Sequence, residues 1–203
     1  MQYDTDLIII GAGSAGLSVA AGAVQMGSRV VLIEGGQMGG DCLNTGCVPS
    51  KALIEAARLA KGAVSAEKLG VSCRNVTVDY ASVMHHVHET IATIESHDSQ
   101  ERFESLGVRV IRGYAKFASK NSVTVGDETI TARRIVVATG AKPTVPPIDG
   151  LEKIEYFTNE NFFENHDRPD HLIIIGGGPI GVEMAQAHAQ LGIETTLIER
   201  FEI

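Results

Sequence analysis

Short apolar runs and glycine-rich turns alternate along the chain in an order that occurs twice. Residues 7–10 and 172–175 are apolar without alternation, as expected for parallel strands buried on both faces. Each run is followed by a glycine turn, a helix-forming segment (17–26 and 182–191) and a second strand-like run (29–33 and 194–198). This order is typical of a dinucleotide-binding α/β fold, so we predict two such units.

The first glycine turn has the spacing that a bound pyrophosphate requires. Gly11 makes the tight turn, Gly13 lets the pyrophosphate approach the helix N-terminus, and Gly16 lets the helix pack on the strand. Glu34 closes the second strand, where a carboxylate can accept hydrogen bonds from ribose hydroxyls. We therefore predict that this copy binds a dinucleotide.

The second copy has the same elements at the same spacing, in Gly176, Gly178, Gly181 and Glu199. Two copies imply either two bound dinucleotides or one duplicated repeat, and the cysteine segment between them favours two. Glu199 favours NAD, because a carboxylate repels the 2′-phosphate of NADP. Arg200 could still accept that phosphate, so NADP stays open.

The segment 39–51 contains two cysteines five positions apart, Cys42 and Cys47, between glycines and ahead of a helix-forming run at 51–63. A bridge between them needs a distorted first helical turn, which the glycines allow. Unpaired N–H groups at a helix N-terminus favour a thiolate. A buried pair of free thiols and a structural disulfide are the alternatives, and no further ligands stand at zinc spacing. Between two nucleotide signatures, a redox-active disulfide is favoured.

The remaining segments suggest ordinary structural roles. Residues 65–78 look irregular, and Cys73 within them is structural or incidental. Residues 79–106 read as one long helix; its histidines are His85, His86, His88 and His97. His85 and His88 could ligate a metal, but a solvated helix face is the better interpretation. Short strands with a hairpin turn at 126–128 follow, then a buried strand at 135–138 and a stiff linker at 143–147.

Composition and charge narrow the function classes. The 203 residues are 44% hydrophobic and 21% charged, which is ordinary for a globular protein. A net charge of −8 without a basic cluster argues against nucleic-acid binding. Residues 7–28 lack charges but are rich in glycine and follow acidic residues, so they fit neither a membrane span nor a signal peptide. We expect a cytoplasmic protein.

The segment from Gly39 to Lys51 closely resembles the redox motif of the pyridine nucleotide–disulfide oxidoreductases, which include dihydrolipoamide dehydrogenase, mercuric reductase and glutathione reductase. The resemblance covers essentially the whole chain, as the N-terminal portion of a longer polypeptide. It implies an FAD/NAD(P)-binding Rossmann-like three-layer α/β fold. An FAD-binding domain would occupy 1–146, and 147–203 would be the first half (βαβ) of a truncated NAD(P)-binding domain.

The resemblance also implies residue roles. Cys47 would lie beside the flavin and Cys42 would exchange with substrate; Lys51 would lie near the flavin N5, with Glu183 as its partner. An ordinary surface ion pair is the alternative for Lys51 and Glu183. The implied cofactor contacts are Gly11, Gly13, Ser14, Ala15, Gly16, Glu34, Gly40, Lys51, Thr139 and Gly140 for FAD, and Gly176, Gly178, Ile180, Gly181 and Glu199 for NAD(P)H.

Three function classes follow. The resemblance implies electron transfer between NAD(P)H, FAD, the Cys42–Cys47 disulfide and a dithiol, disulfide or metal-ion substrate, in a homodimer. An NADH-dependent flavoprotein that reduces quinone or oxygen is a second class, and a truncated, non-catalytic flavin-binding module is a third. The family's His–Glu acid–base pair belongs to a C-terminal domain, so we expect this chain alone to be inactive.

Overall fold

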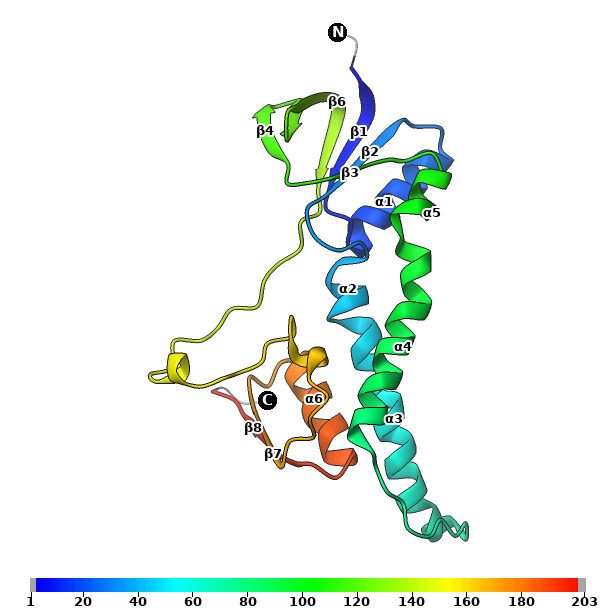
Figure 1. Cartoon of the computed structure of the whole chain (residues 1–203), viewed down its shortest axis with the longest axis vertical. Helices are drawn as coiled ribbons and strands as arrows, with labels where there is room; N and C mark the ends of the chain where they lie inside the picture. Colours follow the sequence, from blue (N-terminus) through cyan, green and yellow to red (C-terminus); the bar gives the residue numbers. More distant parts are fainter. Residues whose placement is uncertain (1–2, 201–203) are drawn as a thin grey trace. The chain divides into compact units, whose positions relative to one another are not determined.

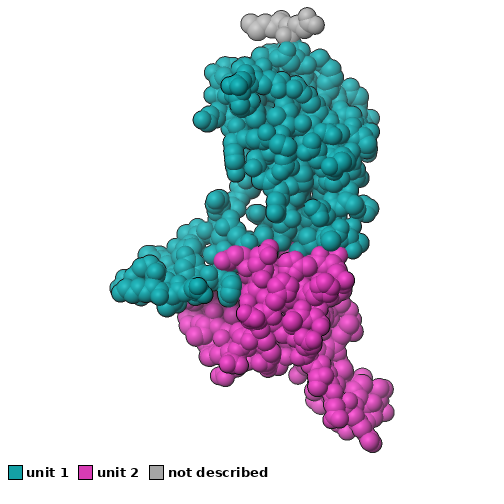
Figure 2. All heavy atoms as spheres, in the orientation of Figure 1, with its two compact units in different colours: residues 1–46, 91–160 teal, residues 47–90, 161–203 magenta. Residues whose placement is uncertain are grey.

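The computed structural model describes residues 3–200, which form two compact units. Within the described residues, the first unit comprises 3–46 and 91–160, and the second comprises 47–90 and 161–200 (Figure 2). Each unit therefore contains two separate stretches of the chain. The two units are described in turn.

A six-stranded sheet forms the centre of the first unit (Figure 1). Its parallel strands are β1 (Thr5–Ile10), β2 (Val30–Glu34), β3 (Arg109–Arg112) and β6 (Glu128–Val137). Two further strands, β4 (Lys116–Ser119) and β5 (Ser122–Val125), run antiparallel and complete the order β3-β2-β1-β6-β5-β4. Strand β6 pairs with β5 through Thr131 and with β1 from Ala132 onward. It therefore joins the parallel sheet to the β-meander.

Alternate residues of the central strands pack into two separate cores. On one face, Ile9 and Leu32 pack with Leu17 of α1 (Ser14–Gln25) and with Phe103 of α5 (Gln100–Ser105). On the other face, Ile8 and its neighbours pack against the meander; the members of this second core are Ile8, Val31, Ile33, Val123, Val125, Ile130 and Ala132. Helices, parallel sheet and meander thus make three layers, as a buried parallel sheet requires.

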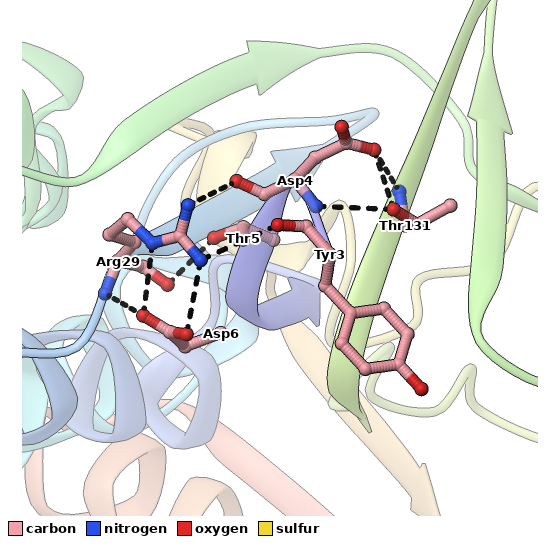
Figure 3. A network of polar contacts seen from close by, with 6 residues as sticks. All are labelled: Tyr3, Asp4, Thr5, Asp6, Arg29 and Thr131. Atoms are coloured by element: carbon pink, nitrogen blue, oxygen red, sulfur yellow. Dashed lines mark hydrogen bonds and ion pairs between the residues drawn. The ribbon is translucent and has the colours of Figure 1, made fainter. Parts of the chain in front are cut away.

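A polar network fastens the strands at the end of the sheet where β1 begins (Figure 3). The Arg29 guanidinium donates to the Asp6 carboxylate at 3.2 Å and to the Asp4 carbonyl at 2.9 Å. The Asp4 carboxylate accepts from the Thr131 backbone N–H at 2.8 Å and from its hydroxyl at 2.6 Å. This network links β1 to the start of β2 and to the point where β6 changes partner.

The second unit combines helices with a two-stranded parallel sheet. It contains α3 (Cys47–Ser65), the first part of α4 (Tyr80–Asp98), β7 (His171–Ile175), α6 (Pro179–Gln190) and β8 (Glu194–Ile198). Short 3₁₀ turns lie at η1 (Ala66–Leu69) and η3 (Phe162–Glu164); a third, η2 (Leu151–Lys153), belongs to the first unit. Helix α6 packs against both strands and against α3.

The structure confirms the predicted fold class and both strand–turn–helix–strand copies. The turn at Gly126 and Asp127 connects antiparallel β5 and β6, as expected for a hairpin. The single helix predicted for 79–106 is wrong. It is divided at Ser99, whose hydroxyl accepts from the Arg102 N–H and caps a separate α5.

The apolar run at 135–138 is not the separate buried strand that the sequence predicts. Residues 135–137 are the last three residues of β6, and Val137 is 60% exposed instead of buried. The domain boundary at 146/147 stays a prediction. Across residues 3–200, no helix has both the length and the apolar character needed to cross a membrane.

Candidate functional site

The first glycine turn is formed by very close approaches of the backbone. Gly11 has φ +107°, and a Cβ at this position would lie 2.1 Å from the Ala138 carbonyl oxygen. A Cβ on Gly16 would lie 1.8 Å from the Gly11 carbonyl oxygen. Neither position has room for a side chain, so α1 begins directly against the end of β1.

The N-terminus of α1 is open to a ligand. Its N-cap residue is Gly13, no side chain caps it, and its first turn holds no acidic residue. Ser14 and Ala15, the first helical residues, are exposed. Uncapped N–H groups and the helix dipole favour an anion here, so the loop fits the pyrophosphate of a dinucleotide.

Glu34, at the end of β2, braces this turn. Its carboxylate accepts from the Ala12 N–H at 2.5 Å and from the Gly36 N–H at 2.6 Å. The Gly113 N–H donates to the Glu34 carbonyl at 2.8 Å, which holds the end of β3 alongside. The structure therefore places the carboxylate beside the glycine turn and adds a role that the spacing did not reveal, namely the fixing of two backbone amides.

The cysteine segment docks onto the same turn. The Gly39 N–H donates to the Ala12 carbonyl at 2.9 Å, and an isolated parallel bridge joins Gly13 to Gly39. Gly40 has φ +58°, and a Cβ there would lie 2.6 Å from the Gly13 Cα. The backbone that leads into the cysteines is thus held against the backbone of the nucleotide turn.

Two short helical segments position the cysteines. Cys42 is half-buried in α2 (Gly40–Asn44) of the first unit, and Cys47 is exposed as the first residue of α3 in the second unit. Helix α3 therefore begins four residues earlier than predicted and places Cys47 at its N-terminus.

Asn44, which the sequence did not single out, holds the cysteine segment in shape. Its side-chain amide donates to the Met38 carbonyl at 3.0 Å and to the Gly40 carbonyl at 2.9 Å. The signal available in the sequence is an asparagine in a glycine-rich segment, because asparagine side chains commonly form hydrogen bonds with the backbone of turns. The neighbouring Thr45 hydroxyl is buried and has no hydrogen-bond partner among the described residues.

The loop after β6 completes the surroundings of the first turn. The Ala138 N–H donates to the Ile10 carbonyl at 2.8 Å, and the Thr139 nitrogen would lie 3.1 Å from a Cβ on Gly11. Gly140 has φ +69° and lies near the Asp41 carboxylate, which would be 3.8 Å from a Cβ on it. Thr139 therefore lies beside the first glycine turn and Gly140 lies near the cysteine segment, while their contact with a cofactor stays a prediction.

The second glycine turn repeats two contacts of the first, the close helix packing at its third glycine and the carboxylate bond to a turn amide, while its first glycine has open space around it. Gly176 has φ +114°, and a Cβ on Gly181 would lie 1.9 Å from the Gly176 carbonyl oxygen. The Glu199 carboxylate accepts from the Gly177 N–H at 2.6 Å, as Glu34 does from Ala12. Helix α6 starts after Gly178 without a side-chain cap, and Ile180 in its first turn is exposed. This turn fits a second dinucleotide.

Lys51 and Glu183 form an ion pair within the second unit. The Lys51 Nζ lies 2.8 Å from both carboxylate oxygens of Glu183, which links α3 to α6. Both side chains are partly exposed. The predicted partnership therefore exists in the structure, while a role near a flavin stays a prediction.

Cys73 and His88, the other candidate residues, make none of the contacts described for the two glycine turns and the cysteine segment. Cys73 is exposed in an irregular segment. His88 does not belong to a solvated helix face, because its Nε2 donates to the Phe163 carbonyl at 2.9 Å and its ring stacks on His166. Between residues 3 and 200, no group of three or more histidine, cysteine or acidic side chains is arranged to hold a metal ion.

Comparison with known protein families gives one match that covers nearly the whole chain. Residues 5–203 match the model of the pyridine nucleotide-disulphide oxidoreductases. Among curated relatives, a mercuric reductase of Bacillus cereus is 38% identical over 99% of this chain and 32% of its own length. Dihydrolipoyl dehydrogenase 3 of Haloarcula marismortui is 34% identical over 98% of this chain and 43% of its own length.

Solved structures agree with the sequence relatives. The Cu(II) complex of the HOCl-induced flavoprotein disulfide reductase RclA from Escherichia coli superposes with a TM-score of 0.82 at 29% identity, over 98% of this chain and 42% of that one. The chain thus spans about a third to two fifths of the length of these proteins.

Proposed function

Because the chain belongs to the pyridine nucleotide-disulphide oxidoreductase family, we propose that it forms the FAD site, the redox cysteines and part of the nicotinamide-dinucleotide site of a flavin-dependent disulfide oxidoreductase. Its relatives include a mercuric reductase, a dihydrolipoyl dehydrogenase and a flavoprotein disulfide reductase. In the whole enzyme the bound cofactors would supply hydride and electron transfer. The residues of this chain would bind and orient the cofactors and would carry out thiol exchange.

The first glycine turn would hold the ADP half of FAD. The uncapped N–H groups of Ser14, Ala15 and Gly16 would receive the pyrophosphate, and the Glu34 carboxylate would accept from ribose hydroxyls. Gly40, Thr139 and Gly140 surround this turn and would contact the remainder of the cofactor. Lys51, with Glu183 holding its ammonium group, would stabilise negative charge on the reduced ring.

Cys42 and Cys47 would perform the thiol chemistry. Two electrons and two protons convert their disulfide into two thiols. The Cys42 thiolate then attacks a substrate disulfide, forms a mixed disulfide and releases the first substrate thiol. Attack by Cys47 on the Cys42 sulfur releases the second thiol and restores the Cys42–Cys47 disulfide. A thiophilic metal ion is the alternative acceptor, since the same two thiolates could bind it.

The second glycine turn would take the nicotinamide dinucleotide. Gly176, Gly178, Ile180 and Gly181 would contact its pyrophosphate, and Glu199 favours NAD because its carboxylate repels a 2′-phosphate. NADP remains the second candidate because Arg200 is adjacent. The whole protein would be a cytoplasmic homodimer that acts on a small dithiol, disulfide or metal ion.

One observation carries this proposal: the backbone at Gly39 and Gly40 rests on Ala12 and Gly13. A nucleotide turn alone is common, and so is a cysteine pair. Their direct contact means that the cysteine-bearing segment and a dinucleotide on α1 would be neighbours. This is the arrangement that electron transfer between a flavin and a disulfide requires.

FAD titration of the chain tests the arrangement. Gly40→Ala should weaken FAD binding at least tenfold, or about 1.4 kcal/mol, because the added Cβ separates the segment from Gly13. Gly126→Ala is the matched control, since Gly126 has φ +57° against +58° for Gly40 but has open space around it. Equal FAD affinity in both variants, or no FAD binding by the unmodified chain, would contradict the proposal.

A further inference from the structure

A buried hydroxyl without a partner lies in the cysteine segment. Within residues 3–200, one buried side-chain oxygen makes no hydrogen bond, and it is the hydroxyl of Thr45. Threonine hydroxyls at a helix end commonly bond the carbonyl three or four residues back, and this one does not. Burying an unpaired hydroxyl costs free energy, so such groups are rare in native proteins and call for a partner that forms at another stage.

The backbone around Thr45 folds back on Asp41 and Cys42. Thr45 is the C-cap of α2, and its N–H donates to the Asp41 carbonyl at 2.9 Å. Gly46 follows and has no room for a side chain, because a Cβ there would lie 2.7 Å from the Asp41 carbonyl oxygen and 3.4 Å from the Cys42 Cα. Thr45 is therefore held within one helical turn of Cys42.

Cys42 is the reactive group that this turn brings near the hydroxyl. It precedes Thr45 by three positions on the same short helix. Side chains of a helical turn lean toward the N-terminus, and residues three positions apart are neighbours on its surface. Cys42 is half-buried, as a partner for a buried hydroxyl must be, whereas Cys47 is exposed.

Neighbouring charges give a thiolate at Cys42 little support. Helix α1, which packs against α2, has no ionisable side chain. The ionisable neighbour on α2 itself is Asp41, whose negative charge disfavours a second negative charge on the next residue. An uncharged hydrogen-bond donor is therefore the means by which this segment can stabilise the thiolate.

We propose that Thr45 is a positioning residue for Cys42, and that its hydroxyl donates a hydrogen bond to the Cys42 sulfur once that thiol has ionised. A neutral thiol is a weak acceptor and a charged acceptor is a strong one, which explains a hydroxyl that has no partner beside the neutral thiol. The use of this thiolate in exchange with a substrate rests on the proposed function, but the hydrogen bond itself does not.

Alkylation of Cys42 by iodoacetamide in the full chain tests the hydrogen bond without FAD. Cys47→Ser and Cys73→Ser are present in every sample, so that Cys42 is the one remaining thiol. Thr45→Val removes the hydroxyl and keeps the branched shape, and Thr45→Ser keeps the hydroxyl. Thr77→Val, at an exposed threonine of the irregular segment before α4, is the matched control.

The rates should differ in opposite directions at neutral and at alkaline pH. At pH 7, Thr45→Val should react at least twofold more slowly than Thr77→Val, because fewer of its Cys42 thiols are ionised. At pH 10 it should react at least twofold faster, because a thiolate that lacks a donor is the stronger nucleophile. Thr45→Ser should match Thr77→Val at both pH values.

A merely structural hydroxyl would give a different pattern. If its loss loosened the segment, alkylation would be faster at every pH and the urea midpoint at pH 6 would fall. The proposal expects a urea midpoint no lower than that of Thr77→Val, because the hydroxyl has no bond to lose while Cys42 is neutral. Equal rates, a rate change of the same sign at both pH values, or a lower midpoint would each overturn the inference. Absence of FAD binding would refute the proposed function alone.

Discussion

Single glycines account for much of the site because their missing side chains leave room for backbone contacts. Gly16 and Gly181 occupy equivalent places, each with a hypothetical Cβ less than 2 Å from the carbonyl oxygen of the first glycine in its turn. The Glu34 and Glu199 carboxylates bind backbone amides in the same two turns. The similarity of the two copies is therefore a similarity of contacts as well as of sequence.

Gly16→Ala should destabilise the first unit by about 1–3 kcal/mol, because its Cβ would lie 1.8 Å from a backbone oxygen that cannot move aside. Gly22→Ala is the matched control, since Gly22 is on the same helix and has no atom within 4 Å of the new Cβ. Urea unfolding curves measure both changes. If Gly16→Ala were as stable as Gly22→Ala, the close packing of α1 on β1 would be refuted.

At the scale of elements, the division between α4 and α5 shows what hydrophobic spacing misses. Apolar residues at helical spacing continue through Ser99, but the serine hydroxyl competes for backbone N–H groups and starts a new helix. Helix α5 then places Phe103 in the core beneath the sheet. A capping residue thus overrides the periodicity around it.

Ser99→Ala should lower the free energy of unfolding by about 1 kcal/mol, the usual cost of a lost N-cap. Ser18→Ala serves as the control, because the Ser18 hydroxyl donates to a carbonyl inside α1 and caps no helix. Chemical denaturation of the two variants makes the comparison. A loss in Ser18→Ala as large as that in Ser99→Ala would argue against capping as the cause.

The network at the start of β1 should make stability depend on acidic pH. Hydrogen bonds from Thr131 lower the pKa of Asp4, and those from Arg29 lower the pKa of Asp6. A carboxylate whose pKa is lower in the folded than in the unfolded protein stabilises the fold fully at pH values above its unfolded pKa, about 4. This stabilisation is lost as the pH falls through the folded pKa. The thermal midpoint should therefore fall below about pH 4.

Arg29→Gln should reduce this acid dependence in part, because the Asp6 carboxylate loses the guanidinium donors and keeps the backbone N–H of residue 29. Arg74→Gln, in the irregular segment after η1, should leave it unchanged. The thermal unfolding midpoints of both variants are measured from pH 2.5 to 6. If the thermal midpoint of Arg29→Gln fell with pH as steeply as that of the unmodified protein, this network would not be the cause of the acid dependence.

Across the whole molecule, local patterns were predictable and long-range partners were not. Each glycine turn is specified within a single strand–turn–helix stretch, so both could be read from spacing. The docking of Gly40 on Gly13 and the pairing of β6 with β1 depend on chain segments distant in sequence. Spacing along the chain carries no information about such contacts.

An anaerobic titration of the FAD-loaded protein with dithionite, followed by visible absorbance, tests the central claim most directly. If Cys47 lies beside the flavin, two-electron reduction should produce a long-wavelength band from its thiolate against oxidised FAD. The band should persist in the Cys73→Ser control and disappear in Cys47→Ser. Simple bleaching of the flavin in the unmodified protein would show that the cysteines are outside the electron path, and a flavoprotein that reduces quinone or oxygen would replace the disulfide oxidoreductase.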